Sequence, residues 1–141
     1  MMRRTWLSGL LSAAIVAGFV GVAAAQSALE PQTTPGGINW VSGGIGFDES
    51  LALRKIEGNY NLRLLFAVEG SGEYLADVVV IIQNQEGQAV LEATSQGPRL
   101  LAQVPPGGYT VTATSGGSTV TRRLNVPRGR TVENSFYFPA Q

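Results

Sequence analysis

The side chains able to do chemistry in this chain are almost all carboxylates and guanidinium groups. The 141 residues include no His and no Cys, which excludes Ser-His-Asp triads, thiol enzymes and zinc sites built on sulfur. Two carboxyl groups ~5–10 Å apart would suffice to hydrolyse a glycoside. The spacing of the acidic residues singles out no such pair, so we predict no catalytic residue. The acidic residues beyond position 25 are Glu30, Asp48, Glu49, Glu57, Glu69, Glu73, Asp77, Glu86, Glu92 and Glu133.

No metal and no cofactor are expected. Calcium can bind through oxygen ligands alone, but the sequence contains no D-x-[DN]-x-[DN]-G loop. Asp48 and Glu49 are better explained as the acidic start of a helix. The glycines at 43, 44 and 46 lack the spacing and the lysine of a phosphate-binding loop, so we interpret them as a hinge.

A group of arginines is the first candidate binding site, and it consists of Arg122, Arg123, Arg128 and Arg130. If 118–138 folds as one hairpin, these side chains form a positive patch, and guanidinium forks match sulfate, phosphate or carboxylate groups. The alternative is a charged edge that opposes sheet-to-sheet aggregation. Arg122 shares parity with the apolar Val120. On a buried face it would need a carboxylate partner, for which Glu133 and Asp77 are the candidates.

Aromatic side chains are the second candidate site. Tyr137 has the opposite parity to Phe136 and Phe138, so it should face outward. Trp40 and Tyr74 are expected near the ends of loops or strands. A carbohydrate-binding protein would bring Tyr137 close to Trp40 or Tyr74 on one surface. The alternative is that each ring caps the core.

The elements that position these side chains are expected to lie in residues 47–141. Residues 1–25 combine two arginines, an uncharged apolar stretch and a final Ala-Ala-Ala, which is typical of a secretory signal peptide cleaved before Gln26. An uncleaved membrane anchor is the alternative, because residues 7–25 are just long enough to span a bilayer. Cleavage would leave a chain with no sulfur, since both methionines lie in the first two positions.

Residues 26–46 are rich in glycine and proline and are predicted to be a flexible linker. Asp48 is a suitable N-cap for a short helix over about 49–57, with Gly58 just beyond its end.

The remainder of the sequence predicts an all-β domain. Apolar stretches alternate with Gly, Pro and Asn clusters at the spacing of a β-sandwich. The seven strands are predicted at about 61–69, 75–83, 88–94, 99–104, 109–114, 118–126 and 131–138.

Two of these strands, 64–68 and 78–82, are apolar on both faces. Such strands are usually central in a sheet, and the helix would then cover the outer face. Alternatively, an apolar outer face is a surface for a partner.

The stretch from Ala76 to Phe138 also carries the motifs of a known family. These are A-D-V-x-V-x-I (76–82), G-x-x-V (87–90), G-P (97–98), V-P-P-G-G-Y-T-V-T-A (104–113) and R-R-L-N-V (122–126). In these motifs the chain resembles the carboxypeptidase regulatory-like domain, found also in small exported bacterial proteins. Arg99 departs from the aromatic residue that usually follows the G-P pair.

The resemblance implies a seven-stranded, Greek-key, prealbumin-like sandwich with one short N-terminal helix. It also implies structural roles in turns and core, and no enzymatic residue. The residues concerned are Gly97, Pro98, Pro105, Gly107, Tyr109 and Val111.

Together these observations predict a non-catalytic module, periplasmic or secreted after cleavage, that binds a protein or a component of the cell envelope. The numbers of basic and acidic residues are equal, ten of each, which argues against a nucleic-acid partner. Membrane contact is expected only through the signal peptide. The alternatives are a carbohydrate-binding module and, with less support, a two-carboxylate hydrolase.

Overall fold

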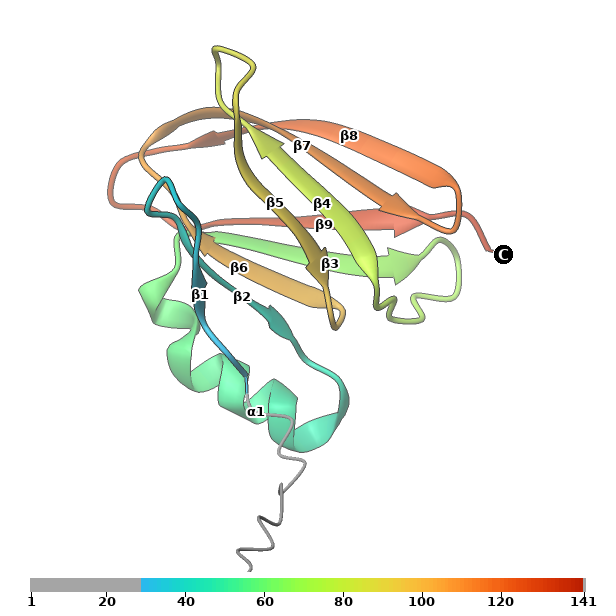
Figure 1. Cartoon of the computed structure of the whole chain (residues 1–141). Coiled ribbons are helices and arrows are strands. Elements are labelled where there is room, and N and C mark those ends of the chain that lie inside the picture. Colours follow the sequence, from blue (N-terminus) through green and yellow to red (C-terminus); the bar gives the residue numbers. More distant parts are fainter. Residues whose placement is uncertain (1–28, 141) are drawn as a thin grey trace, which may run out of the picture.

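The structure, a computed structural model, describes residues 29–140, which form two β-sheets and one α-helix (Figure 1). The signal peptide predicted at 1–25 lies outside these residues. Helix α1 (Gly46–Ile56) continues into a 3-10 turn, η1 (Glu57–Asn59). The strands are β1 (Gln32–Thr33), β2 (Asn39–Gly43), β3 (Leu62–Val68), β4 (Val78–Gln83), β5 (Ala89–Ser95), β6 (Arg99–Gln103), β7 (Gly107–Ser115), β8 (Ser118–Val126) and β9 (Val132–Phe138).

The seven predicted strand ranges coincide with β3 to β9, with ends that agree to within three residues. The structure adds β1 and β2, which lie in the segment expected to be a linker. β2 pairs along its full length with β6, and its Val41 is fully buried. The linker prediction is therefore wrong for residues 39–43, and the folded domain begins before residue 47. Glycine, serine and asparagine surround the two apolar residues of β2, so no alternation is visible in its sequence.

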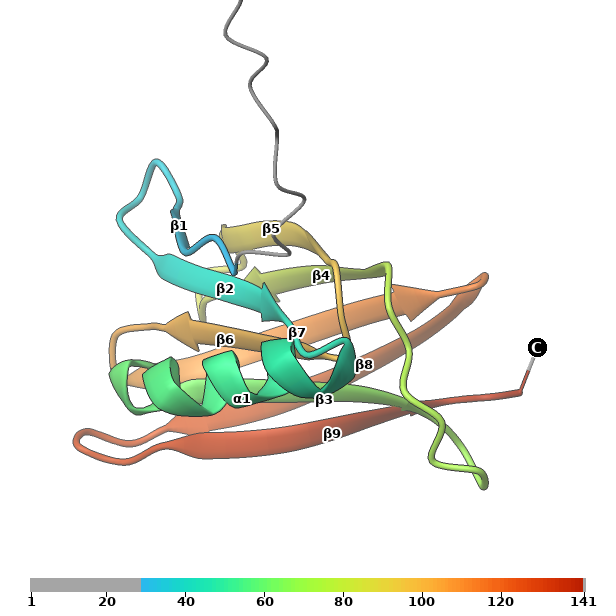
Figure 2. The same ribbon diagram turned by 90° about the horizontal axis from the view of Figure 1, so that it is seen from below.

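The strands divide into two sheets. Sheet A has the order β1-β2-β6-β3-β9, and sheet B has the order β5-β4-β7-β8. Neighbouring strands are antiparallel except β3 and β9, which run parallel. The two sheets face each other, as Figures 1 and 2 show. Strands distant in sequence thus become neighbours, and this decides which side chains share the outer surface of sheet A.

The main core fills the space between the sheets. Alternate residues of each strand enter it, as the period of two requires. Tyr109, Val111 and Ala113 of β7 face Phe66 of β3 and Phe136 of β9 across this core. The two phenylalanine rings lie 5.8 Å apart between centroids, in a tilted arrangement that aromatic pairs favour.

Helix α1 lies on the outside of sheet A, on the side away from sheet B (Figure 2). It buries Leu53 against Val41 and Leu101, with Tyr60 closing the cluster. The helix begins at Gly46 with Ile45 as its N-cap, so Asp48 lies in the first turn and is not the predicted cap. A Glu49 carboxylate oxygen instead accepts hydrogen bonds from the backbone N–H groups of Gly44 and Ile45, at 2.8 and 3.4 Å.

The two strands that are apolar on both faces, β3 and β4, are both central, each with a neighbour on either side. The helix covers sheet A over β2 and β6, so it does not cover β4 of sheet B. Val79 on the outer face of β4 is 45% exposed. Between residues 29 and 140, no helix has the length and apolar character needed to cross a membrane.

Candidate functional site

The outer face of sheet A beside α1 brings together side chains from distant parts of the sequence. Because paired residues point to the same side of a sheet, the register defines this surface. One row contains Glu133, Arg63, Leu101 and Val41, and the next contains Ser135, Leu65, Arg99 and Gly43. The helix covers the Leu101 and Val41 end of the first row, which leaves the β3 and β9 side chains open.

A third row consists of Tyr137, Ala67 and Tyr74. Ala67 of β3 pairs with Tyr137 of β9 on one side and with Tyr74 on the other. Tyr74 takes this position because β6 begins only at Arg99. The two tyrosines are 47% and 65% exposed, whereas the alanine between them is 2% exposed although it faces outward. With strands ~4.8 Å apart, the two tyrosine backbones lie about 10 Å apart, on either side of a small, shielded residue.

Two of the three predicted surface aromatics therefore share one face. Trp40 does not join them. It is half-buried on β2, on the side that packs against the main core. Tyr74 lies on the same face as Tyr137 only because this loop residue forms an isolated bridge with Ala67 of β3. The sequence contains no signal for that bridge.

Beside the tyrosines, a network of charged side chains was not anticipated. Glu57, in η1, contacts the Nη2 atom of Arg99 at 3.1 Å and the Nη1 atom of Arg63 at 3.7 Å. Glu133 contacts the same Arg63 nitrogen at 2.9 Å. Arg63 also donates to the backbone carbonyl of Glu57 at 3.2 Å. Glu57 thus ties the end of the helix to β3 and β6 and holds both guanidinium groups in place.

Two sequence signals for this network were available. Arg63 interrupts the apolar run of β3, and Arg99 replaces the aromatic residue expected after Gly97-Pro98. Both arginines lie on the outer face of the sheet at half-buried positions. Their meeting with Glu57 and Glu133 depends on the register of β3 with β6 and β9, which the pattern alone does not predict.

A cavity of about 260 Å³ lies between this network, the helix and Tyr74. We call it the arginine–tyrosine cavity. Its size is just below the ~300–1,000 Å³ typical of sites for drug-sized ligands. Its lining comes from α1, β3, β6 and β9 and consists of Gly44, Ser50, Arg54, Arg63, Leu64, Leu65, Tyr74, Pro98, Arg99, Glu133, Asn134 and Ser135.

The predicted arginine patch is not assembled as expected. β8 and β9 belong to different sheets, so 118–138 does not form one hairpin. Arg122 meets neither Glu133 nor Asp77 in an ion pair among the described residues. Arg122 is exposed, so the burial on which the need for a carboxylate depended is absent. Its guanidinium carbon lies 5.7 Å from the centre of the Phe136 ring, an aromatic contact.

The other three arginines of that group are exposed, as Arg122 is. Arg123 belongs to β8 and points away from the core, beside Thr110 of β7. Arg128 and Arg130 lie in the turn between β8 and β9. Because this turn connects the two sheets, its arginines are not opposed to those of β8 as they would be in a hairpin.

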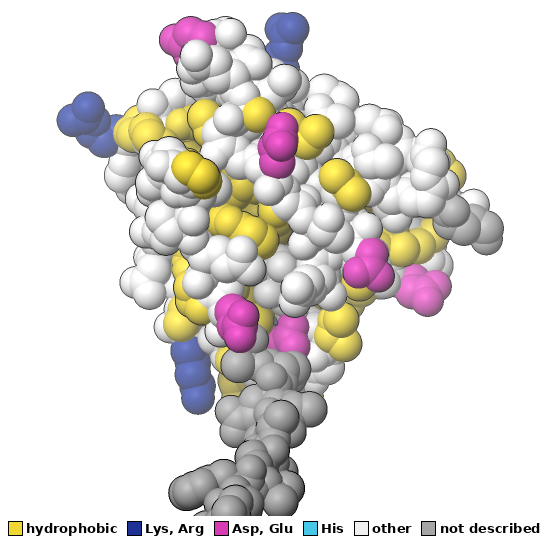
Figure 3. All heavy atoms as spheres, in the orientation of Figure 1, with side chains coloured by type: hydrophobic (Ala, Val, Ile, Leu, Met, Phe, Trp, Pro, Cys, Tyr) yellow, Lys and Arg dark blue, Asp and Glu magenta, His cyan; other side chains and the backbone are white. Residues whose placement is uncertain are grey.

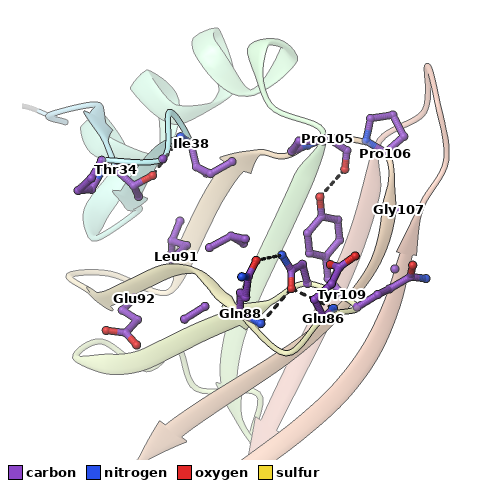
Figure 4. Close-up of a pocket in the computed structure, with 17 residues that line it drawn as sticks. Thr34, Ile38, Glu86, Gln88, Leu91, Glu92, Pro105, Pro106, Gly107 and Tyr109 are labelled. Atoms are coloured by element: carbon purple, nitrogen blue, oxygen red, sulfur yellow. Dashed lines mark hydrogen bonds between the residues drawn. The ribbon is translucent and has the colours of Figure 1, made fainter.

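A larger hollow of about 960 Å³ opens at the end of the sandwich, between the β1–β2 turn and the start of β5 (Figure 4). Ile38, Leu91 and Tyr109 line it, and apolar side chains reach the surface in this region, with separate charged groups around them (Figure 3). Part of its polar rim is used by a local turn, in which the Asn84 side chain bonds the Gln88 side chain and the backbone N–H groups of Glu86 and Gln88. We therefore give more weight to the smaller cavity, where charged groups converge.

The residues predicted to be structural lie in turns and in the core. Tyr109 is buried and its hydroxyl donates to the Pro105 carbonyl, across the turn that leads to β7 (Figure 4). Gly107 has a positive φ of 154°, and Val111 is fully buried. Burial raises the pKa of the hydroxyls of Tyr109 and of Tyr60.

Gly97 and Pro98 form a close contact between β2 and the start of β6. A Cβ atom on Gly97 would lie 2.7 Å from the Cα of Gly43 and closer still to its carbonyl group. The Gly97 carbonyl accepts a bond from the Ser95 hydroxyl at 2.7 Å, and the Pro98 carbonyl accepts one from the Phe66 N–H at 2.8 Å. This contact sets where Arg99 begins β6.

Among residues 29–140, no group of three acidic side chains is arranged to hold a metal ion. Two carboxylates do come close, because Glu57 and Glu133 contact the same nitrogen of Arg63. Both carboxylates are already engaged by arginine side chains, Glu57 by Arg63 and Arg99 and Glu133 by Arg63. The arrangement fits a positioning network better than an acid–base pair.

Comparison with known proteins identifies no family for this chain. No family model and no curated protein matches the sequence, so the resemblance to the carboxypeptidase regulatory-like domain stays a prediction. Among solved structures, the chain is similar to the major pilin subunit of Bacillus cereus, with 13% identity and a TM-score of 0.42. The similarity covers 54% of this chain and 28% of the pilin chain. A likeness this distant carries no argument about the site or its ligand.

Proposed function

We propose that the chain is an exported, non-catalytic β-sandwich module that binds a glycan of the cell envelope on the outer face of sheet A. The observation that carries this proposal is the row of Tyr74, Ala67 and Tyr137. It supports the proposal because a carbohydrate-binding protein was expected to bring Tyr137 close to Trp40 or Tyr74 on one surface, and Tyr74 lies in this row. The proposal includes a prealbumin-like Greek-key topology, export to the periplasm or the outside, and cleavage before Gln26.

The chemistry of the row suits a sugar. The face of an aromatic ring is negative and attracts the C–H groups of a pyranose. Ala67 adds no bulk between the rings, so a ligand can lie across both tyrosines. The backbones of the two tyrosines lie about 10 Å apart, which is of the order spanned by two linked sugar rings. Polar groups from Ser135, Arg63 and Arg99 lie beside them to receive the sugar hydroxyls.

The test is binding to a glycan array, followed by titration of the hits with variants. Tyr74→Ala and Tyr137→Ala should each weaken binding about tenfold, since an aromatic contact contributes ~0.5–1.5 kcal/mol beyond the area it covers. Tyr137→Phe should retain most of the affinity because the ring is kept. The matched control is Phe47→Ala, which removes a 79% exposed ring on α1 that does not line the arginine–tyrosine cavity.

Absence of binding to every glycan, or equal weakening by Phe47→Ala and the two tyrosine variants, would contradict the proposal.

A protein partner is the second candidate, and a different surface favours it. Ile45, Phe47 and Leu51 are all exposed around the first turns of α1. Large apolar side chains grouped on a surface are typical of sites of protein association. Pull-down followed by native mass measurement tests this candidate: a partner lost in Phe47→Ala but retained in Tyr137→Ala would support it. An inert monomer would count against it.

A further inference from the structure

The arginine–tyrosine cavity has an excess of positive charge at one wall. Arg54 reaches it from α1, Arg63 from β3 and Arg99 from β6. The lining itself contains one carboxylate, that of Glu133. The carboxylate of Glu57 lies behind Arg63 and Arg99, and that of Glu49 accepts a hydrogen bond from the N–H of Gly44, which also lines the cavity. Among the lining residues, three guanidinium groups therefore face one carboxylate on a surface where sugar binding through the tyrosines has been proposed.

The three arginines differ in how they are held. Arg63 and Arg99 are half-buried and fixed by Glu57. Arg54 is exposed and forms no ion pair with any residue from 29 to 140. The charge of Arg54 is therefore the one available to a ligand, because the carboxylates of Glu57 and Glu133 offset the charges of Arg63 and Arg99.

Tyr74 forms the wall of the same cavity on the side of the tyrosine row. A sugar ring stacked on Tyr74 would lie at the cavity that Arg54 also lines, so a substituent entering the cavity would share it with this arginine. A guanidinium fork binds a carboxylate through two parallel hydrogen bonds, which a hydroxyl cannot reproduce.

We propose that the ligand is an acidic sugar, with its carboxylate in the arginine–tyrosine cavity against Arg54. This inference rests on the proposed glycan binding and names the ligand class. The competing explanation is that Arg54 only complements the C-terminal end of the helix dipole. Lys55 has the same relation to that end, since both are basic residues of the last turn, but it does not line the cavity.

The experiment compares a short oligogalacturonide with its carboxyl-reduced, neutral form, using calorimetric titration of the full chain. The acidic form should bind about tenfold more tightly, as expected for a charge-assisted, two-bond pair, and added salt should reduce the difference. Arg54→Gln should abolish the preference, and Arg54→Lys should restore only part of it, because lysine keeps the charge but loses the fork. Lys55→Gln is the matched control and should leave the preference intact.

Equal affinity for the two forms, or loss of the preference in Lys55→Gln, would overturn the inference while leaving glycan binding in place. If neither form binds and the tyrosine variants behave as the parent on every glycan tested, both the inference and the proposed function fail. The two failures are thereby distinguishable.

Discussion

Gly97→Ala tests the close contact between β2 and the start of β6. The added Cβ would lie 2.7 Å from the Cα of Gly43, whereas non-bonded carbons rest at about 3.5–4.0 Å. The two segments would have to separate by about 1 Å. The neighbouring atoms belong to the backbone, so no change of side-chain rotamer can relieve the clash.

We expect a loss of about 3 kcal/mol of unfolding free energy, the upper end of the usual cost of overpacking. Urea unfolding followed by circular dichroism measures it, with Trp40 on β2 as a fluorescence probe close to the contact. The matched control is Gly58→Ala in η1, where an added Cβ meets nothing within 4 Å and φ is not positive. That variant should be neutral or stabilised by up to ~1 kcal/mol. A difference below about 0.5 kcal/mol between the two variants would refute the reasoning.

Three further predictions concern stability. Tyr109→Phe should cost about 1 kcal/mol, since it removes the hydroxyl that donates to the Pro105 carbonyl; an unchanged urea midpoint would contradict this. Leu53→Ala should cost ~2–5 kcal/mol because it empties the cluster beneath α1, whereas Leu51→Ala, at an exposed position of the same helix, should cost much less. Burial raises the pKa of Tyr60 and Tyr109 above the ordinary 10.0, so stability should be complete below pH ~10 and fall as the pH rises further. Thermal melts across this range should show that fall, and it should be smaller in Tyr60→Phe.

The strands could be predicted because turn residues separate them and side chains alternate within them. Tyr137 was expected to face outward on that basis, and it does. β2 was missed because Trp40 and Val41 are its only large apolar residues. The charged network could not be predicted, since it depends on a register between segments far apart. Arg63 and Glu133 are separated by 70 positions, and no local pattern reports such a pairing.

The prediction of an arginine patch was wrong for a related reason. Consecutive strands usually pair, and that rule placed β8 beside β9. In the structure β9 crosses to the other sheet and runs parallel to β3. The sequence of 127–131 has the composition of a tight hairpin turn, and composition does not distinguish a hairpin from a crossover between sheets.

The parallel pairing of β3 with β9 has a consequence for the order of assembly. The hairpins β4–β5 and β7–β8 join neighbours in the chain and close short loops. The pairing of β3 with β9, by contrast, requires the last strand of the chain. Contacts of such long range form slowly because the intervening chain must first be ordered. A chain that appears N-terminus first would therefore complete the tyrosine row and the Arg63–Glu133 pair only after its C-terminal strand is in place. Only completely folded molecules would then bind a ligand at this surface, and truncated or partly folded copies would not bind.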